Sequence, residues 1–123
     1  MDVPELVTQF ATSVAAQSEA IARGDHKSGN KHAKAYVTAF ETIRRLGLAG
    51  RDALSVLLSH DRPDVRVMAA SYLLRHSGQR ARAVLEAEAR GKGLVAFGAA
   101  QALKRWDDGT WALDLEPEPQ RPS

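Results

Sequence analysis

Apolar residues recur at three- and four-residue steps along most of this chain, the spacing that gathers side chains on one face of an α-helix. The first run comprises Val3, Leu6, Val7, Phe10, Val14 and Ile21. Asp2 stands three residues before Glu5, an arrangement that satisfies unpaired amides at a helix start, and Gly24 suits the left-handed conformation that ends a helix. The pattern therefore predicts a helix from the N-terminus to about Arg23.

A second amphipathic helix is predicted directly after a tight turn, because Asp25 is placed to cap it. Its apolar stripe consists of Ala33, Tyr36, Val37, Phe40, Ile43 and Leu46. Basic residues spread over the remaining circumference, namely Lys27, Lys31, Lys34, Arg44 and Arg45. Gly47 marks the end of this segment, so the two predicted helices form a hairpin.

Four shorter helices are predicted beyond Gly47, over about residues 51–59, 63–76, 80–90 and 94–106. Pro63 is tolerated in a first turn, and Asp61 stands where it can cap that helix. A glycine-rich turn over residues 91–93 separates the last two helices, and after Gly109 the helical pattern is lost.

Core positions recur along the second half of the chain. A shift by 30 residues superposes Leu54 on Val84, Val65 on Val95, Val67 on Phe97, Ala69 and Ala70 on Ala99 and Ala100, Leu73 on Leu103, and Arg75 on Arg105. Each unit is then a helix pair whose apolar face is too small to fold alone, so stacked pairs share one core. We predict an all-α, right-handed stack of about six antiparallel helices in one domain over residues 1–113, and a flexible acidic, proline-rich tail over residues 114–123.

The composition excludes several classes of protein. An apolar content of 44% and a charged content of 26% are ordinary for a globular domain, so neither a disordered nor a fibrous chain is expected. The absence of cysteine excludes disulfides, thiolate nucleophiles and the usual structural zinc sites. The N-terminus lacks the pattern of a signal peptide, and no stretch approaches the ~20 apolar residues that span a bilayer. We expect a soluble cytoplasmic protein.

The formal net charge of +2 hides a strong asymmetry. Residues 20–106 hold 16 Lys and Arg against 7 Asp and Glu, which gives a net charge of +9. Residues 1–19 contribute −3 and residues 107–123 contribute −4. A partner would therefore meet a basic body with acidic ends.

The histidines do not form a metal site. A zinc site on a helix needs ligands three or four residues apart, and no pair among His26, His32, His60 and His76 has that spacing. His60 and His76 lie at predicted helix C-termini, where an imidazole favours the negative end of the helix dipole or faces solvent. No serine lies in a nucleophile motif. We expect no metal, no cofactor and no enzymatic activity.

Carboxylate pairs and one glycine turn also have simpler structural readings. Asp61 with Asp64 fits a helix start, and Glu86 with Glu88 fits an exposed face, so neither pair predicts acid–base catalysis. The turn over residues 91–93 could present amides to an anion, but it lacks the strand and full spacing of a phosphate loop. A tight turn between helices is the simpler interpretation.

The segment 54–74 resembles a HEAT repeat. It combines a leucine-rich first helix, an Asp-x-Pro-x-Val-Arg turn and a second helix that carries Ala69 and Ala70. The second unit departs from this pattern, because glycines stand at the positions of Asp61 and Pro63, and Ala96 stands at the position of Arg66. The resemblance implies a HEAT-like α-α superhelix.

Over about residues 5–113 the chain also resembles a small bacterial domain-of-unknown-function family, the one numbered two thousand and nineteen. The residues that carry this resemblance are Leu6-Val7-x-x-Phe10, Gly24-Asp25, Leu46-Gly47, Gly93-Leu94-x-x-Phe97, Leu103-x-x-Trp106 and Gly109-Thr110. This family implies a HEAT-like fold and no established activity. Comparable small HEAT-like bacterial proteins include immunity proteins, which neutralise a toxin by binding it.

An arginine row is predicted on the second helices of the repeat. The 30-residue shift places Arg75 and Arg105 equivalently, and Arg66 precedes them on the same type of helix. One hypothesis is that this concave basic row binds the backbone of nucleic acid, with an affinity that falls steeply with salt. The small net charge, the lack of interleaved aromatic residues and the acidic ends weigh against it.

The hypothesis that we favour is a protein-binding module, in which the arginines, Tyr72, Trp106 and Trp111 are candidate anchors. The periodicity places Trp106 on the apolar face of the last helix, where it is expected to close the core. Trp111 follows Gly109 and either folds back over the core or docks on a partner.

The sharpest version of this hypothesis is a bacterial immunity protein that binds and neutralises a toxin domain. If the toxin is a basic nuclease, the acidic residues Asp107, Asp108 and Asp114 and the first helix match it electrostatically. An acidic target would instead favour the arginine row. The oligomeric state is left open by the sequence.

Overall fold

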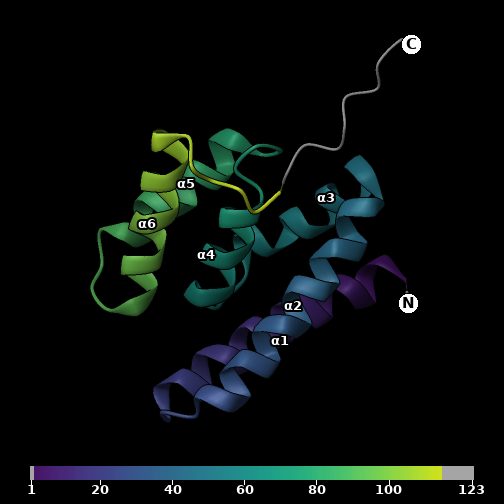
Figure 1. Ribbon diagram of the computed structural model, residues 1–123. Helices are drawn as coiled ribbons and strands as arrows, with labels where there is room; N and C mark the ends of the chain where they lie inside the picture. The colour runs from purple at the N-terminus through teal and green to yellow at the C-terminus, as the bar shows by residue number, and fades with distance from the viewer. Residues whose placement is uncertain (1, 115–123) are drawn as a thin grey trace.

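The computed structural model describes residues 2–114, and every regular element within them is helical (Figure 1). The elements are α1 (Val3–Ala22), α2 (His26–Arg45), α3 (Gly47–Leu54), the 3-10 helix η1 (Ser55–Ser59), α4 (Pro63–Tyr72), α5 (Gly78–Ala89) and α6 (Leu94–Asp108). The predicted all-α class is therefore confirmed. No helix in the described part of the chain has the length and apolarity needed to cross a membrane.

The caps of α1 and α2 form as the sequence predicts. The Glu5 amide donates to the Asp2 carboxylate at 2.9 Å, and the Asp2 amide donates to the Glu5 carboxylate at 3.4 Å. The Ser28 amide donates to the Asp25 carboxylate at 3.1 Å, after Gly24 reverses the chain with a φ of 74°. These contacts satisfy amides that no helical carbonyl can reach, and they define the long α1–α2 hairpin.

Two predicted boundaries in the middle of the chain are wrong. α3 begins at Gly47 and not near residue 51, because a left-handed φ of 68° at Gly47 lets the next helix begin at once. Gly50 then permits close packing on α2, since a Cβ there would collide with the carbonyl oxygen of Ile43. α4 ends at Tyr72 and not near residue 76, because Leu73 leaves the helical conformation.

The predicted cap of α4 by Asp61 is also wrong. The N-cap residue is Arg62, and no side chain makes a cap hydrogen bond there. Asp64 instead accepts a hydrogen bond from the Val65 amide at 2.8 Å inside the first turn. A carboxylate at this position still favours the positive end of the helix dipole.

α4 lies at the centre of the fold, between the α1–α2 hairpin and the α5–α6 pair (Figure 1). An aromatic cluster of Phe10, Tyr36, Phe40 and Tyr72 joins it to the hairpin. The centre of the Tyr72 ring lies 5.5 Å from the ring centre of Phe10 and 4.5 Å from that of Phe40. The Tyr72 residue is only 6% exposed. Tyr72, which the sequence predicted as a partner anchor, is therefore buried, and its ring packs in the core.

The 30-residue repeat is visible in the order of the elements. Shifting α3, η1 and α4 by 30 positions places them on α5 and α6. The turn over residues 91–93 joins α5 to α6, and Gly93 has a φ of 92° there. Beyond α6, a non-helical segment over residues 110–114 runs back toward α3 and α4 (Figure 1).

Candidate partner-binding groove

An apolar hollow of about 430 Å³ opens between the second half of α1, α4 and the start of α6. Its apolar lining comes from Val14 and Ile21 of α1, Val67 and Met68 of α4, and Leu94 and Val95 of α6. The polar groups of the lining are Ser18, Asp64 and Lys92. Three helices thus expose a mostly apolar surface to solvent, although the same helices bury other apolar side chains in the core.

A second hollow of about 340 Å³ continues the first along α6. The two share Val67, Met68 and Gly98. The second is bounded by Arg105 and by the returning segment that contains Trp111. We call the two together the α4–α6 groove, which follows α6 from Leu94 to Arg105.

Large apolar side chains are exposed at one end of this groove and on the adjoining turn of α6. Leu94 is 73% exposed, and Phe97, one turn further along α6, is 63% exposed. Ile21 lines the same end from α1 and is 41% exposed. Ile21 and Leu94 line the first hollow together, so these two exposed apolar side chains are not isolated, and exposed apolar patches mark binding surfaces in soluble proteins.

Gly98 lies in the middle of the groove and in the interior of α6. A Cβ at this position would meet no atom within 4 Å, so nothing inside the described chain requires a glycine there. Glycine in a helix interior costs roughly 0.5–1 kcal/mol relative to alanine. This contrasts with Gly50, where the neighbouring helix occupies the space that a side chain would need.

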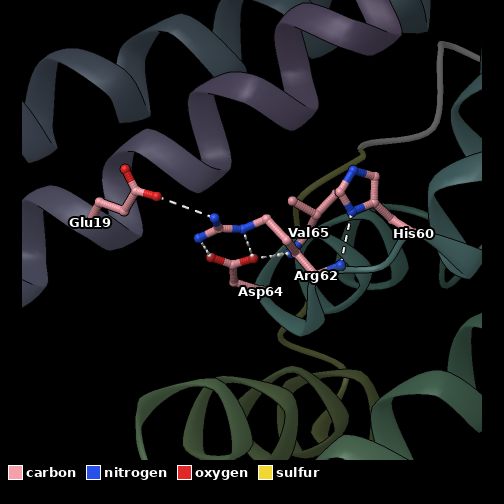
Figure 2. A network of polar contacts seen from close by, with 5 residues as sticks. All are labelled: Glu19, His60, Arg62, Asp64 and Val65. Carbon is pink, nitrogen blue, oxygen red and sulfur yellow. Dashed lines mark hydrogen bonds and ion pairs between the residues drawn. The ribbon is translucent and has the colours of Figure 1, made fainter.

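The acidic group on the wall of the groove is neutralised locally. Arg62 donates to the Asp64 carboxylate at 3.0 and 2.9 Å and reaches Glu19 of α1 at 3.2 Å (Figure 2). Burial opposes ionisation of Asp64, but hydrogen bonds from Arg62 and Ser18 outweigh it and hold its pKa below the usual value. This network also ties α1 to the start of α4 beside the groove.

The cations at the two ends of the groove are not neutralised in this way. Within residues 2–114, neither the Lys92 ammonium nor the Arg105 guanidinium has a carboxylate within ion-pair distance. Both residues are exposed. The α4–α6 groove therefore presents an apolar surface with a positive charge at each end.

The predicted arginine row does not form a free basic surface. Arg66 is engaged by Glu88 of α5 at 2.6 Å, and it also donates to the His60 carbonyl at 2.8 Å. Arg75 lies 3.5 Å from Asp114, and its guanidinium stands 5.7 Å from the centre of the Trp111 ring. Of the three predicted arginines, only Arg105 lines the groove as an exposed charge.

Trp111 folds back over the core, one of the two alternatives left open by the sequence. Its indole nitrogen donates to the Ser71 carbonyl of α4 at 2.7 Å. Its ring meets Trp106 edge-on, with ring centres 5.1 Å apart. Trp106 packs against the core from α6, as its periodicity predicts.

Asp114 is buried, although the sequence predicted it as the first residue of a flexible tail and as a partner contact. It is 1% exposed and accepts two hydrogen bonds from Arg51 of α3, at 2.7 and 2.9 Å. A carboxylate can be buried in this way because the guanidinium supplies paired donors and the opposite charge. The predicted tail over residues 115–123 lies outside the described residues.

The other predicted acidic contacts are exposed and paired within the chain. Asp107 accepts from Arg82 of α5 at 3.0 Å, and Asp108 accepts from Lys104 at 3.0 Å. Both carboxylates are at least half exposed. They remain accessible to solvent, but they lie outside the lining of the groove.

His60, which is the C-cap residue of η1, and His76 each contact a neighbouring polar group. His60 Nδ1 accepts from the Arg62 amide at 3.0 Å (Figure 2), and His76 Nε2 lies 2.8 Å from the Asp52 carboxylate. Among residues 2–114, no group of three or more histidine and carboxylate side chains is arranged to hold a metal ion.

Sequence reasoning did not single out Gly98, which lines the groove, or the exposed Phe97, which precedes it on α6. The 30-residue repeat assigned Phe97 to the core, at the position equivalent to Val67, and it gave no role to Gly98. One signal in the sequence could have drawn attention to Gly98: it stands inside an otherwise regular helical pattern, where glycine lowers the stability of the helix.

Comparison with known proteins supports the fold. No family model matches the chain, and no curated protein matches it. The chain is similar to the protein RPA1889 from Rhodopseudomonas palustris CGA009, whose crystal structure superposes with a TM-score of 0.83. The two are 26% identical, over 96% of this chain and 95% of that one. The likeness supports the helical arrangement across nearly the whole length, and the resemblance to the family of unknown function stays a prediction.

Proposed function

We propose that this chain is a non-enzymatic, HEAT-like protein-binding module whose partner docks in the α4–α6 groove. The observation that carries the proposal is the exposure of Leu94 and Phe97 beside an apolar hollow formed by three helices. A bacterial immunity protein that neutralises a toxin domain is the specific form of this function that we put forward.

The HEAT-like interpretation is supported by the equivalence of two helical units. The shift that places α3, η1 and α4 on α5 and α6 superposes one fully buried alanine of α4 on another of α6, Ala69 on Ala99. Stacked helix pairs use extended surfaces of their helices to bind partners. The open face of α6 is such a surface.

Protein is favoured over nucleic acid by the charges near the groove. Nucleic-acid backbone binding requires several free cations that can neutralise phosphates. Arg66 is engaged by Glu88, and Arg75 is engaged by Asp114. The nucleic-acid alternative therefore has to rely on cations such as the lysines of the exposed face of α2, which lie away from the groove lining.

The test is co-expression with the product of the adjacent gene, followed by size-exclusion chromatography with light scattering. We expect a tight one-to-one complex that is lost in the double variant Leu94→Asp/Phe97→Asp. The matched control is Leu48→Asp/Val56→Asp, because these side chains are 71% and 64% exposed on α3 and η1. Salt-dependent binding to DNA without a protein complex would instead support the alternative.

A further inference from the structure

We infer that the α4–α6 groove binds one amphipathic helix of the partner, which carries a carboxylate near each end and crosses α6 at Gly98. This inference rests on the proposed function and specifies the chemistry of the partner. It is drawn from the open space at Gly98, the apolar lining and the two cations at the ends of the groove.

The space at Gly98 indicates a close approach from outside. The chain keeps a destabilising residue in the interior of α6, although no neighbouring atom lies within 4 Å of the place that a Cβ would take. Glycine at a surface allows the backbone of a second helix to come near. Leu94 and Phe97 stand on the preceding turn, where they can flank such a helix.

The lining favours a helix over an extended peptide. An extended segment would place its own amides and carbonyls against a mostly apolar surface, where each unpaired group is costly. A helix satisfies these groups internally and offers one apolar stripe. The groove runs from Leu94 to Arg105, which is about 16 Å along α6 and matches roughly three helical turns.

The two cations of the groove determine where the partner helix would carry acidic residues. Lys92 stands at one end of the groove and Arg105 at the other, and neither is paired within residues 2–114. Asp64 does not cancel them, because Arg62 neutralises it. A partner helix with Asp or Glu near both ends would pair with both cations, whereas a basic helix would be repelled.

A second copy of the chain fits the groove less well. In a symmetric dimer the same surface of each copy packs against the other. Contact between the two grooves would then bring Lys92 of each copy near a cation of the other groove. Two unpaired positive charges would then approach across an apolar contact, which is unfavourable. The free cations therefore select a partner with a different, acidic sequence.

The experiment uses a phage-displayed library of helical peptides of about 14 residues, long enough to span the groove. The full chain serves as bait, and the best peptide is synthesised and titrated by fluorescence anisotropy. We expect enrichment of peptides with an apolar stripe, Asp or Glu toward both ends and a small residue at the centre of the stripe. Gly98→Leu should weaken binding about tenfold or more, because its side chain fills the crossing point.

The matched control is Gly78→Leu, because a Cβ at Gly78 would also meet no atom within 4 Å and lies at the start of α5, away from the groove. Circular dichroism and thermal unfolding check that both variants fold. Gly98→Ala, with the smallest possible side chain, should fold at least as stably as the parent chain and bind more strongly than Gly98→Leu.

Several results would overturn the inference. These are enrichment of basic or extended peptides, failure to enrich any peptide whose binding needs Leu94 and Phe97, dimerisation of the chain through the groove, or equal binding by Gly98→Leu and Gly78→Leu. A complex with the adjacent gene product that needs Leu94 and Phe97 but tolerates Gly98→Leu would refute this inference alone. Peptide binding at Gly98 without that complex would refute the toxin partner alone.

Discussion

The Arg51–Asp114 pair attaches the returning C-terminal segment to α3 through two hydrogen bonds of 2.7 and 2.9 Å. Arg51 is 8% exposed and Asp114 is 1% exposed, so both charges are removed from water. Arg75 adds a second positive group 3.5 Å from the same carboxylate. Burying such a pair costs free energy, but removing only one of the two charges costs more, because the other charge stays buried without its partner.

We predict that Asp114→Asn destabilises the fold by about 3 kcal/mol, because it removes the buried negative charge that faces the Arg51 guanidinium. Urea unfolding at neutral pH measures the change. Asp108→Asn is the matched control, since that carboxylate is half exposed and pairs with Lys104, and its loss should cost at most about 1 kcal/mol. Equal effects of the two substitutions would show that the buried pair has no special role.

The periodicity of the sequence could not reveal the pairing of Arg51 with Asp114. Arg51 and Asp114 are 63 positions apart, and no local rule links residues at that separation. Asp114 stands in an acidic, proline-rich context, which favours a disordered tail. The observation that decides otherwise is tertiary: the indole of Trp111 bonds to α4 and brings the following residues over α3.

The contact between the α1–α2 hairpin and α4 is formed by the aromatic cluster. Phe10 comes from α1, Tyr36 and Phe40 come from α2, and Tyr72 comes from α4. Burial raises the pKa of Tyr72 from 10.0 to about 12, and burial also raises the pKa of Tyr36. A phenolate at either position would place a charge in this apolar contact.

We predict that the fold loses stability above about pH 10 and that Tyr72→Phe reduces the loss. The folded state holds the Tyr72 proton more tightly than the unfolded state, so this contribution is complete below pH 10.0 and falls as the pH rises toward about 12. At 1.36 kcal/mol per pKa unit, the loss attributable to Tyr72 approaches about 2 kcal/mol near the upper limit.

Urea unfolding of the parent chain and the variant, at a series of pH values, tests this prediction. Tyr36 keeps its own hydroxyl in the variant, so part of the loss should remain. Parallel curves for the two proteins would contradict it, because they would mean that Tyr72 ionises equally in both states.

The helices themselves were largely predictable, and the errors follow from packing. Asp2 and Asp25 predict their helix starts because capping is local. The 30-residue repeat equates Val67, which is 7% exposed, with Phe97, which is 63% exposed. α4 is covered by helices on both sides, whereas α6 ends the stack and has an open face. A sequence repeat shows that two residues occupy equivalent positions in their helices, but it does not show whether another helix covers each position.

Charge on the whole molecule is distributed unevenly, and the groove is one of the places where cations stay unpaired within the described residues. Another is the exposed face of α2, with Lys27, Lys31 and Lys34. The sequence predicted the basic body, but it could not predict that Glu88 and Asp114 would engage two of the three arginines. Pairing between distant residues therefore decides which part of a basic surface remains available.

For this reason we predict that charge at the groove, and not the total charge, controls association with the partner. Lys92→Glu/Arg105→Glu should lower the association rate with the adjacent gene product about tenfold at low salt and weaken its salt dependence. Lys27→Glu/Lys34→Glu changes the net charge of the chain by the same amount, but it does so on α2, and it should have a much smaller effect. Stopped-flow kinetics over a range of ionic strengths separates the two variants. If they slow association equally, then the basic body as a whole attracts the partner; if only the α2 variant slows it, the docking surface lies on α2 and the groove is not the binding site.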